Sequence, residues 1–126
     1  MSTKKSVLVI GLVPELVDFT AFPGMTAEKV RAGIASQIEA LHAQGFAARH
    51  VYADLGETAE SVVGGMLDAE RFDCVCIGAG VRLPPPHFLL FEKLINVVHA
   101  RAPQATICFN TGPMDTVEAV KRWARG

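Results

Sequence analysis

The 126-residue sequence has no surplus of positive charge, and this limits the partners that we expect. It carries 12 Lys and Arg against 13 Asp and Glu, for a formal net charge of −1. Proteins that bind nucleic acid through its phosphates usually carry a basic patch or stripe. No cluster of Lys and Arg runs along any segment of this chain. We therefore expect no nucleic-acid partner.

Long hydrophobic runs are also absent. The run VLVIGLV at residues 7–13 ends at Pro14, far short of the roughly 20 residues that span a bilayer. Lys4 and Lys5 before it imitate the charged start of a secretion signal, but no small-residue cleavage site follows. We expect residues 7–13 to form a buried strand, and we expect a cytoplasmic protein without a membrane partner.

Cysteine is scarce, since only Cys74, Cys76 and Cys108 occur, all within apolar runs. No C-x-x-C pair and no helical histidine spacing accompanies them, so we predict no metal site. Cys74 and Cys76 share one face of a strand because they are two residues apart. A redox pair is one interpretation, and small buried apolar residues in a reducing compartment are the other.

The familiar fingerprints of α/β enzymes are missing. No G-x-G-x-x-G follows the first apolar run, and no Gly-Lys-Ser/Thr or G-x-S-x-G motif occurs. The segment LVPELVDFTAFPGM lacks the Ser/Thr-rich phosphate cradle of flavodoxins. Gly78 stands where response-regulator receivers carry an aspartate. The cofactor, the reaction and the substrate therefore stay unknown at this point.

What the sequence does contain is a regular alternation of strands and helices. Nearly continuous apolar runs predict buried strands, and apolar residues at helical spacing predict amphipathic helices. Thr26 is a predicted N-cap, and Asp115 with Glu118 has the form of a capping box. The predicted strands are 6–12, 47–53, 73–79 and 105–110, and the predicted helices follow Thr26 up to Gly45, cover 57–70 and 87–101, and run from 113 or 115 to the C-terminus.

This alternation predicts one α/β domain over residues 1–126. Strands that alternate with helices form βαβ units, which give a parallel sheet with helices on both faces. The simplest right-handed arrangement is a three-layer sandwich with four strands in the order 2-1-3-4.

In outline the chain resembles small flavodoxin-like or half-Rossmann proteins. The segments RFDCVCIGAGVR, FEKLINVVH and APQATICFNTGP also resemble a group of short, uncharacterised bacterial and fungal proteins. No characterised family is matched, so the resemblance implies a fold and no chemistry.

Ligands of open α/β sheets bind beyond the carboxyl ends of the strands. Gly78 and Gly80 follow the third strand, where backbone N–H groups can hold an anion, although a tight turn or close packing explains glycine equally well. Arg82 is a natural partner of a carboxylate or phosphate, or else a surface arginine paired with an acid such as Glu15, Asp18 or Asp54. The predicted ligand-binding residues are Gly11, Gly78, Gly80, Arg82, Asn110 and Thr111, of which Asn110 and Thr111 have helix capping as their alternative role.

Two residues, Asp18 and His87, are candidates for catalysis. Asp18 lies in a long apolar loop at 12–25, and either it or Glu15 becomes a general base if buried against the phenylalanines there. His87 precedes a helix, where a positive charge is disfavoured and a neutral imidazole can accept a proton. The plainer interpretation of His87 is a partly exposed residue without a special role.

Glu92, Asn96 and His99 fall on one face of the third predicted long helix, beside Phe88 and Leu89. This row is interpreted as a polar seam in a dimer, as a solvated face or, least of all, as a catalytic group. The sequence thus predicts a protein that binds a small anionic metabolite and forms a homo-oligomer, and it leaves open whether that protein is an enzyme. The alternative is a self-associating structural protein without catalytic activity.

Overall fold

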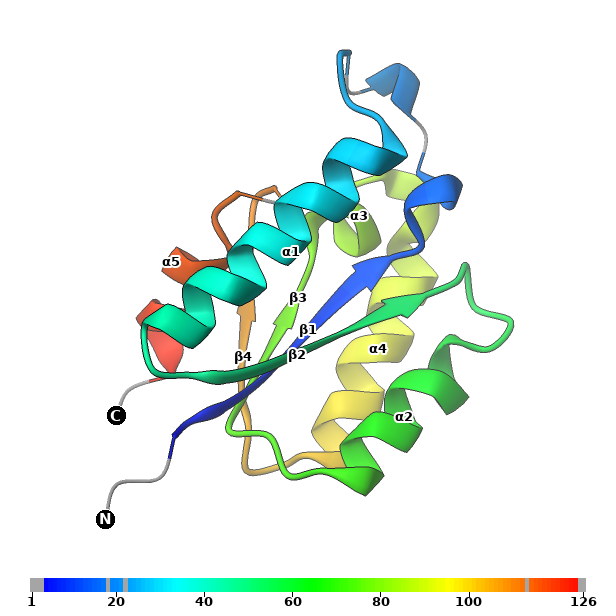
Figure 1. Cartoon of the computed structure of the whole chain (residues 1–126). Helices are drawn as coiled ribbons and strands as arrows, with labels where there is room; N and C mark the ends of the chain where they lie inside the picture. The colour runs from blue at the N-terminus through cyan, green and yellow to red at the C-terminus, as the bar shows by residue number, and fades with distance from the viewer. Residues whose placement is uncertain (1–3, 18, 22, 113, 125–126) are drawn as a thin grey trace.

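Four parallel strands form the centre of the protein, as a computed structural model shows (Figure 1). The structure describes residues 4–17, 19–21, 23–112 and 114–124. The strand order is β2-β1-β3-β4, with β1 pairing along its whole length with β2. The predicted parallel sheet and its order are confirmed. The strands are β1 (Ser6–Leu12), β2 (Ala47–Ala53), β3 (Cys74–Ile77) and β4 (Thr106–Phe109).

Helices cover both faces of the sheet, which makes the three layers that the sequence predicts. In Figure 1, α1 and α5 lie over one face, and α2 and α4 lie over the other. The long helices are α1 (Ala27–Ala43), α2 (Ala59–Ala69), α4 (Phe88–Arg101) and α5 (Thr116–Trp123). Within the described residues, no helix combines the length and apolar character needed to cross a bilayer.

Two apolar clusters hold the layers together, because alternate residues of β1 point to opposite faces. Leu8 and Ile10 pack with the helices α2 and α4, in a cluster that includes Phe72. Val7 and Val9 pack with α1 and α5. Since β1 is central and buried on both faces, its residues from Val7 to Leu12 carry no polar side chain.

Shorter elements at the carboxyl edge of the sheet do not follow from the sequence pattern. A single turn of helix, α3 (Ala79–Arg82), begins directly after β3, where the sequence predicts no helix before residue 87. Three short 3₁₀ helices also occur in the connections before α1 and α4: η1 (Pro14–Leu16), η2 (Phe19–Ala21) and η3 (Pro85–His87). These turns shape the rim where strand ends meet.

One predicted cap is confirmed and one is wrong. Thr26 accepts a hydrogen bond from the N–H of Lys29 at 3.2 Å and so begins α1. Asp115 occupies the N-cap position of α5 but makes no side-chain bond to that helix. Its carboxylate turns back toward the end of β4 instead, so the capping box does not form.

Candidate functional site

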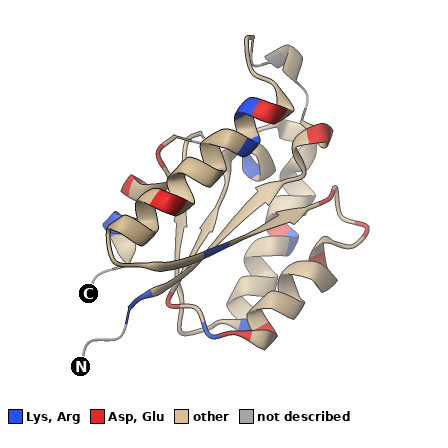
Figure 2. Cartoon of the chain, viewed as in Figure 1, with Lys and Arg blue, Asp and Glu red and all other residues tan. Residues whose placement is uncertain are grey.

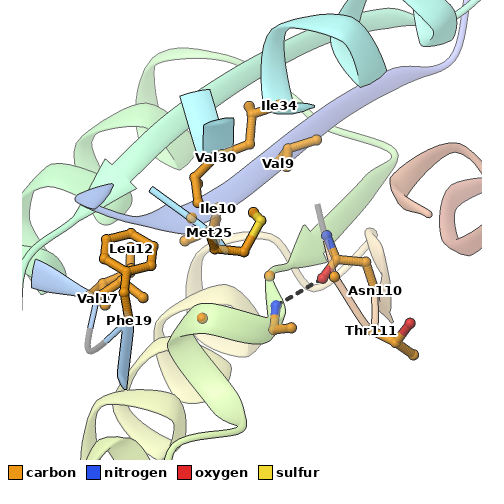
Figure 3. A pocket seen from close by; sticks show the side chains of 15 residues that line it. Val9, Ile10, Leu12, Val17, Phe19, Met25, Val30, Ile34, Asn110 and Thr111 are labelled. Atoms are coloured by element: carbon orange, nitrogen blue, oxygen red, sulfur yellow. Dashed lines mark hydrogen bonds between the residues drawn. The ribbon is translucent and has the colours of Figure 1, made fainter. Parts of the chain in front are cut away.

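An apolar cavity of about 170 Å³ lies at the carboxyl edge of the sheet, beneath the first turns of α1 (Figure 3). It is bounded by the ends of β1 and β3, the segment that follows β4, and the long connection between β1 and α1. Among the described residues that line it, none carries a charge. They are Val9, Ile10, Gly11, Leu12, Val17, Phe19, Met25, Val30, Ile34, Gly78, Ala79, Gly80, Asn110, Thr111 and Gly112.

The connection between β1 and α1 supplies part of the cavity wall. Its residues Val17, Phe19 and Met25 line the cavity, and Val30 of α1 adjoins them. Glu15 and Arg31 tie this connection to α1, since their carboxylate and guanidinium meet in two hydrogen bonds of 2.7 and 3.2 Å. The unusual length of the connection is therefore used to enclose apolar space.

Glycine at two strand ends keeps the backbone close to the cavity. A methyl group added at Gly78 would meet the carbonyl oxygen of Ile10 at 3.0 Å, tighter than nine in ten real contacts of a Cβ atom. Glycine at this position therefore favours the close approach of β3 to β1. At Gly11 a methyl group would lie 3.6 Å from Ile34, an ordinary contact. Neither glycine has a positive φ angle, so close packing explains Gly78.

Asn110 joins three elements at the polar end of the cavity. Its amide oxygen accepts a hydrogen bond from the N–H of Ala79 at 2.8 Å, and its amide nitrogen donates to the hydroxyl of Thr116 at 3.0 Å. Asn110 is 5% exposed. Because Ala79 begins α3 and Thr116 begins α5, this one side chain fixes both helix starts against the end of β4.

The loop after β4 already holds a carboxylate of its own. Asp115 accepts hydrogen bonds from the N–H and the hydroxyl of Thr111, at 3.0 and 2.7 Å, and from the N–H of Gly112 at 3.1 Å. Partial burial raises the pKa of Asp115, but these hydrogen bonds outweigh it and hold the pKa below its ordinary value of 3.8. Thr111, one of the donors expected to receive an external anion, therefore binds an internal carboxylate.

The loop between β2 and α2 repeats this arrangement. The carboxylate of Asp54 accepts from the hydroxyl of Thr58 at 2.7 Å and from the N–H of Gly56 at 3.0 Å. The hydroxyl bond from Thr58 is the main cause that lowers the pKa of Asp54. Two of the four loops at this edge thus satisfy their donors internally.

Arg82 does not line the cavity, although it was predicted to hold a ligand. Its guanidinium donates to the carbonyl oxygen of Asn110 and lies over the ring of Phe109, 5.3 Å from the centroid. It makes no described ion pair with Glu15 or Asp54, the pairing that the sequence offered as an alternative. Arg82 supports the end of β4 from outside the cavity wall.

The catalytic candidates lie apart from the cavity or outside the described residues. His87 is half-buried, and its Nδ1 lies 2.9 Å from the carbonyl oxygen of Gly80. Because a carbonyl only accepts, Nδ1 carries the hydrogen of this contact. His87 does not line the cavity. Asp18 lies outside the described residues, and Glu15 is exposed and paired with Arg31.

The structure brings Gly11, Gly78, Gly80, Asn110 and Thr111 together in one cavity wall and leaves only Arg82 of the predicted ligand-binding set outside it. Sequence reasoning missed the part of the wall that α1 supplies. The signal was the apolar stripe of α1, from which the sequence predicts only an amphipathic helix. Its first members, Val30 and Ile34, line the cavity, whereas Leu41 is fully buried.

The three cysteines gather on the face of the sheet covered by α1 and α5, as fully buried members of one apolar cluster. The sulfur atoms of Cys74 and Cys108 lie 3.7 Å apart, and all three thiols are free. The contact with Cys108, and then burial, raise the pKa of Cys74 far above its ordinary range. Such thiols are poor nucleophiles.

The charged side chains do not gather at the cavity. Figure 2 shows acidic and basic residues interspersed along the helices, as in α1, where Glu28 and Lys29 are neighbours. Neither the models of protein families nor the curated proteins include a match to this chain. This agrees with the expectation that no characterised family is matched, and the resemblance to a bacterial and fungal group stays a prediction.

Proposed function

We propose that the protein binds a small, largely apolar molecule in the cavity at the carboxyl edge of the sheet. The observation that carries this proposal is the lining itself. Most of the side chains labelled in Figure 3 are apolar, and among the described lining residues only Asn110 and Thr111 have polar side chains. Burial of apolar ligand surface is the main favourable term available in such a site.

The volume limits the ligand to the size of a substituted ring or a short acyl chain. Apolar cavities of about 150 Å³ take up benzene or xenon and exclude water. Drug-sized ligands occupy clefts of roughly 300 Å³ or more. At about 170 Å³, this cavity fits one aromatic ring with a small substituent.

The anionic metabolite predicted from the sequence is the alternative ligand. Its predicted anchor, Arg82, donates to the carbonyl oxygen of Asn110, and the donors of Thr111 and Gly112 bind the carboxylate of Asp115. An incoming anion would compete with that carboxylate. These contacts favour a neutral ligand, and the anion is included below as a separate probe.

A titration followed by amide NMR shifts tests the proposal, with toluene as the neutral probe and benzoate as the anion. We expect toluene to shift the resonances of Gly11, Gly80 and Ile34 in a saturable way. Val30→Phe fills the cavity from α1 and should weaken toluene binding at least tenfold. The matched control is Val62→Phe on α2, where the side chain is 41% exposed and outside the cavity.

Three results bear on the choice between a neutral and an anionic ligand. Absence of saturable toluene shifts at the cavity, or equal weakening by the two phenylalanine variants, contradicts the proposed function. Binding of benzoate without toluene supports the anionic ligand instead. Enzyme activity is not part of the proposal, because His87 and Glu15 do not line the cavity.

Self-association is a second candidate function, favoured by one exposed apolar patch. Phe88 and Leu89 at the start of α4 are 62% and 70% exposed, and Leu83 nearby is 48% exposed. None of them lines the cavity, so oligomerisation and ligand binding are compatible. Asn96 of the predicted polar seam donates to the carbonyl oxygen of Glu92 within its own helix.

The mass in solution tests this second candidate. If the patch joins two copies, the double variant Phe88→Ser/Leu89→Ser should be monomeric in light scattering at concentrations where the unmodified protein is dimeric. Leu55→Ser is the matched control, because Leu55 is 47% exposed and lies in the loop before α2. A monomeric unmodified protein at high concentration contradicts self-association.

A further inference from the structure

Asn110 is the buried polar side chain in the cavity wall, and the orientation of its amide is fixed. The N–H of Ala79 can only donate, so the atom 2.8 Å from it is the amide oxygen. The amide nitrogen then faces the hydroxyl of Thr116, 3.0 Å away. Asn110 is 5% exposed and Thr116 is 2% exposed, so neither contact is easily exchanged for water.

This network leaves one amide hydrogen of Asn110 to be used. An asparagine amide has two N–H hydrogens, and Thr116 accepts one of them. Within the described part of the chain, no other group accepts a hydrogen bond from this nitrogen. Asn110 lines the apolar cavity, so a ligand atom that accepts a bond from the second hydrogen gains affinity.

The surroundings favour a neutral acceptor over a charged one. Asp115 binds Thr111 and Gly112, two residues of the same wall, through its carboxylate. Among the described lining residues, no cation offsets that negative charge. A ligand carboxylate would meet like charge there, whereas a carbonyl or ether oxygen would not. Figure 3 places Asn110 and Thr111 on one side of the cavity and the apolar side chains of Leu12, Val17 and Phe19 on the opposite side.

We propose that the natural ligand is a small neutral molecule with an apolar body and one hydrogen-bond acceptor, such as a ketone, and that Asn110 selects it. This inference rests on the proposed function, because it names the class of ligand for the same cavity. The acceptor lies against the amide nitrogen of Asn110, and the apolar body contacts the segment after β1. Asn110 therefore acts as the specificity-determining residue.

Two isosteric probes test this assignment. Acetophenone and α-methylstyrene differ in a carbonyl oxygen against a CH₂ group, so both fit a cavity of one shape. Calorimetry gives the dissociation constants of both probes, and their ratio is determined for each protein. This ratio is then compared between the unmodified protein and each variant, because the difference in aqueous solubility between the probes cancels in that comparison. Asn110→Asp keeps the acceptor for Ala79 but replaces the amide hydrogens with an oxygen.

We expect Asn110→Asp to reduce the preference for acetophenone over α-methylstyrene roughly fivefold to tenfold, the range of one hydrogen bond. Asn110→Ser, which removes the amide without adding charge, should shift the ratio in the same direction. The matched control is Asn96→Asp on α4, an exposed asparagine outside the cavity. It should leave the ratio unchanged within twofold.

The outcomes separate this inference from the proposed function. If neither probe binds the unmodified protein, the proposed function is wrong, and so is the inference that rests on it. If both probes bind but the Asn110 variants weaken them equally, Asn110 has a purely structural role and the inference is wrong, while the cavity remains a binding site. A preference for benzoate over acetophenone in the unmodified protein also overturns it.

Discussion

The amide oxygen of Asn110 accepts a hydrogen bond of 2.8 Å from the N–H of Ala79, across 31 positions of the chain. This bond ties the end of β4 to the first turn after β3. It also places both segments in the wall of one cavity. Asn110 thus organises the carboxyl edge whether or not a ligand is bound.

Replacing Asn110 with alanine should lower the free energy of unfolding by about 2 kcal/mol. The substitution leaves the part-buried N–H of Ala79 and the buried hydroxyl of Thr116 without their partner, and each such loss costs about 1–3 kcal/mol when uncompensated. Urea unfolding followed by circular dichroism measures the change. The control Asn96→Ala removes an exposed asparagine and should change the value by less than about 0.5 kcal/mol.

The internal carboxylates of Asp54 and Asp115 predict a loss of stability in acid. Both pKa values are lowered in the folded protein relative to 3.8. Their contribution is therefore fully present above the unfolded pKa and disappears as the pH falls through the lowered folded values. We therefore expect the free energy of unfolding to decrease when the pH is lowered below about 4, and the protonation of these two carboxylates accounts for part of that decrease.

Unfolding curves of Asp54→Asn/Asp115→Asn test that assignment. This variant should be less stable than the unmodified protein at pH 7, and the difference should shrink as the pH approaches 2. A difference that is constant with pH would mean that the loss comes from the altered side-chain geometry and not from ionisation.

Gly65 offers a stabilising substitution in the middle of α2. The residue is exposed, and apart from its chain neighbours and the adjacent backbone of its own helix, no atom lies within 4 Å of the position that a methyl group would take. Gly65→Ala should raise the free energy of unfolding by up to about 1 kcal/mol, because alanine favours the helix over glycine. At the neighbouring Gly64 the methyl group would meet the guanidinium of Arg101 at 3.0 Å. Gly64→Ala should gain less in the same thermal or urea unfolding experiment.

The buried thiols should be inert in the folded protein. Cys74, Cys76 and Cys108 are all 0% exposed. The contact with Cys74 lowers the pKa of Cys108, but the contact with Cys76 and burial outweigh it and raise this pKa to about 12. We expect a chromogenic disulfide reagent to titrate three thiols per chain in denaturant and none rapidly without it. One thiol that reacts rapidly in the native protein would revive the redox interpretation.

The sequence predicts the fold well because β1 and β2 coincide with local runs of apolar residues. Residues 6–12 and 47–53 are strands with the predicted bounds. The third and fourth strands are shorter than predicted, at Cys74–Ile77 and Thr106–Phe109. Their ends depend on neighbours: Gly78 already begins the turn into α3, and Asn110 bends away to bind Ala79 and Thr116.

The site is only partly visible in the sequence. Glycines at strand ends and the polar Asn110 mark the edge, because parallel strands bring their carboxyl ends together. The direction of Arg82 depends on Phe109 and Asn110, nearly 30 residues away, and no local pattern encodes it. The role of Asp115 is hidden in the same way, since its spacing from Glu118 imitates a capping box while its carboxylate serves Thr111.

Xenon uptake tests most directly whether the edge of the sheet encloses ligand-sized apolar space. Crystals under xenon pressure should show one anomalous peak in contact with Phe19, Val30 and Ile34, because apolar cavities of this size take up xenon. The peak should disappear in Val30→Phe and persist in Val62→Phe. Side chains filling that volume, with no xenon peak in the unmodified protein, would contradict the binding cavity.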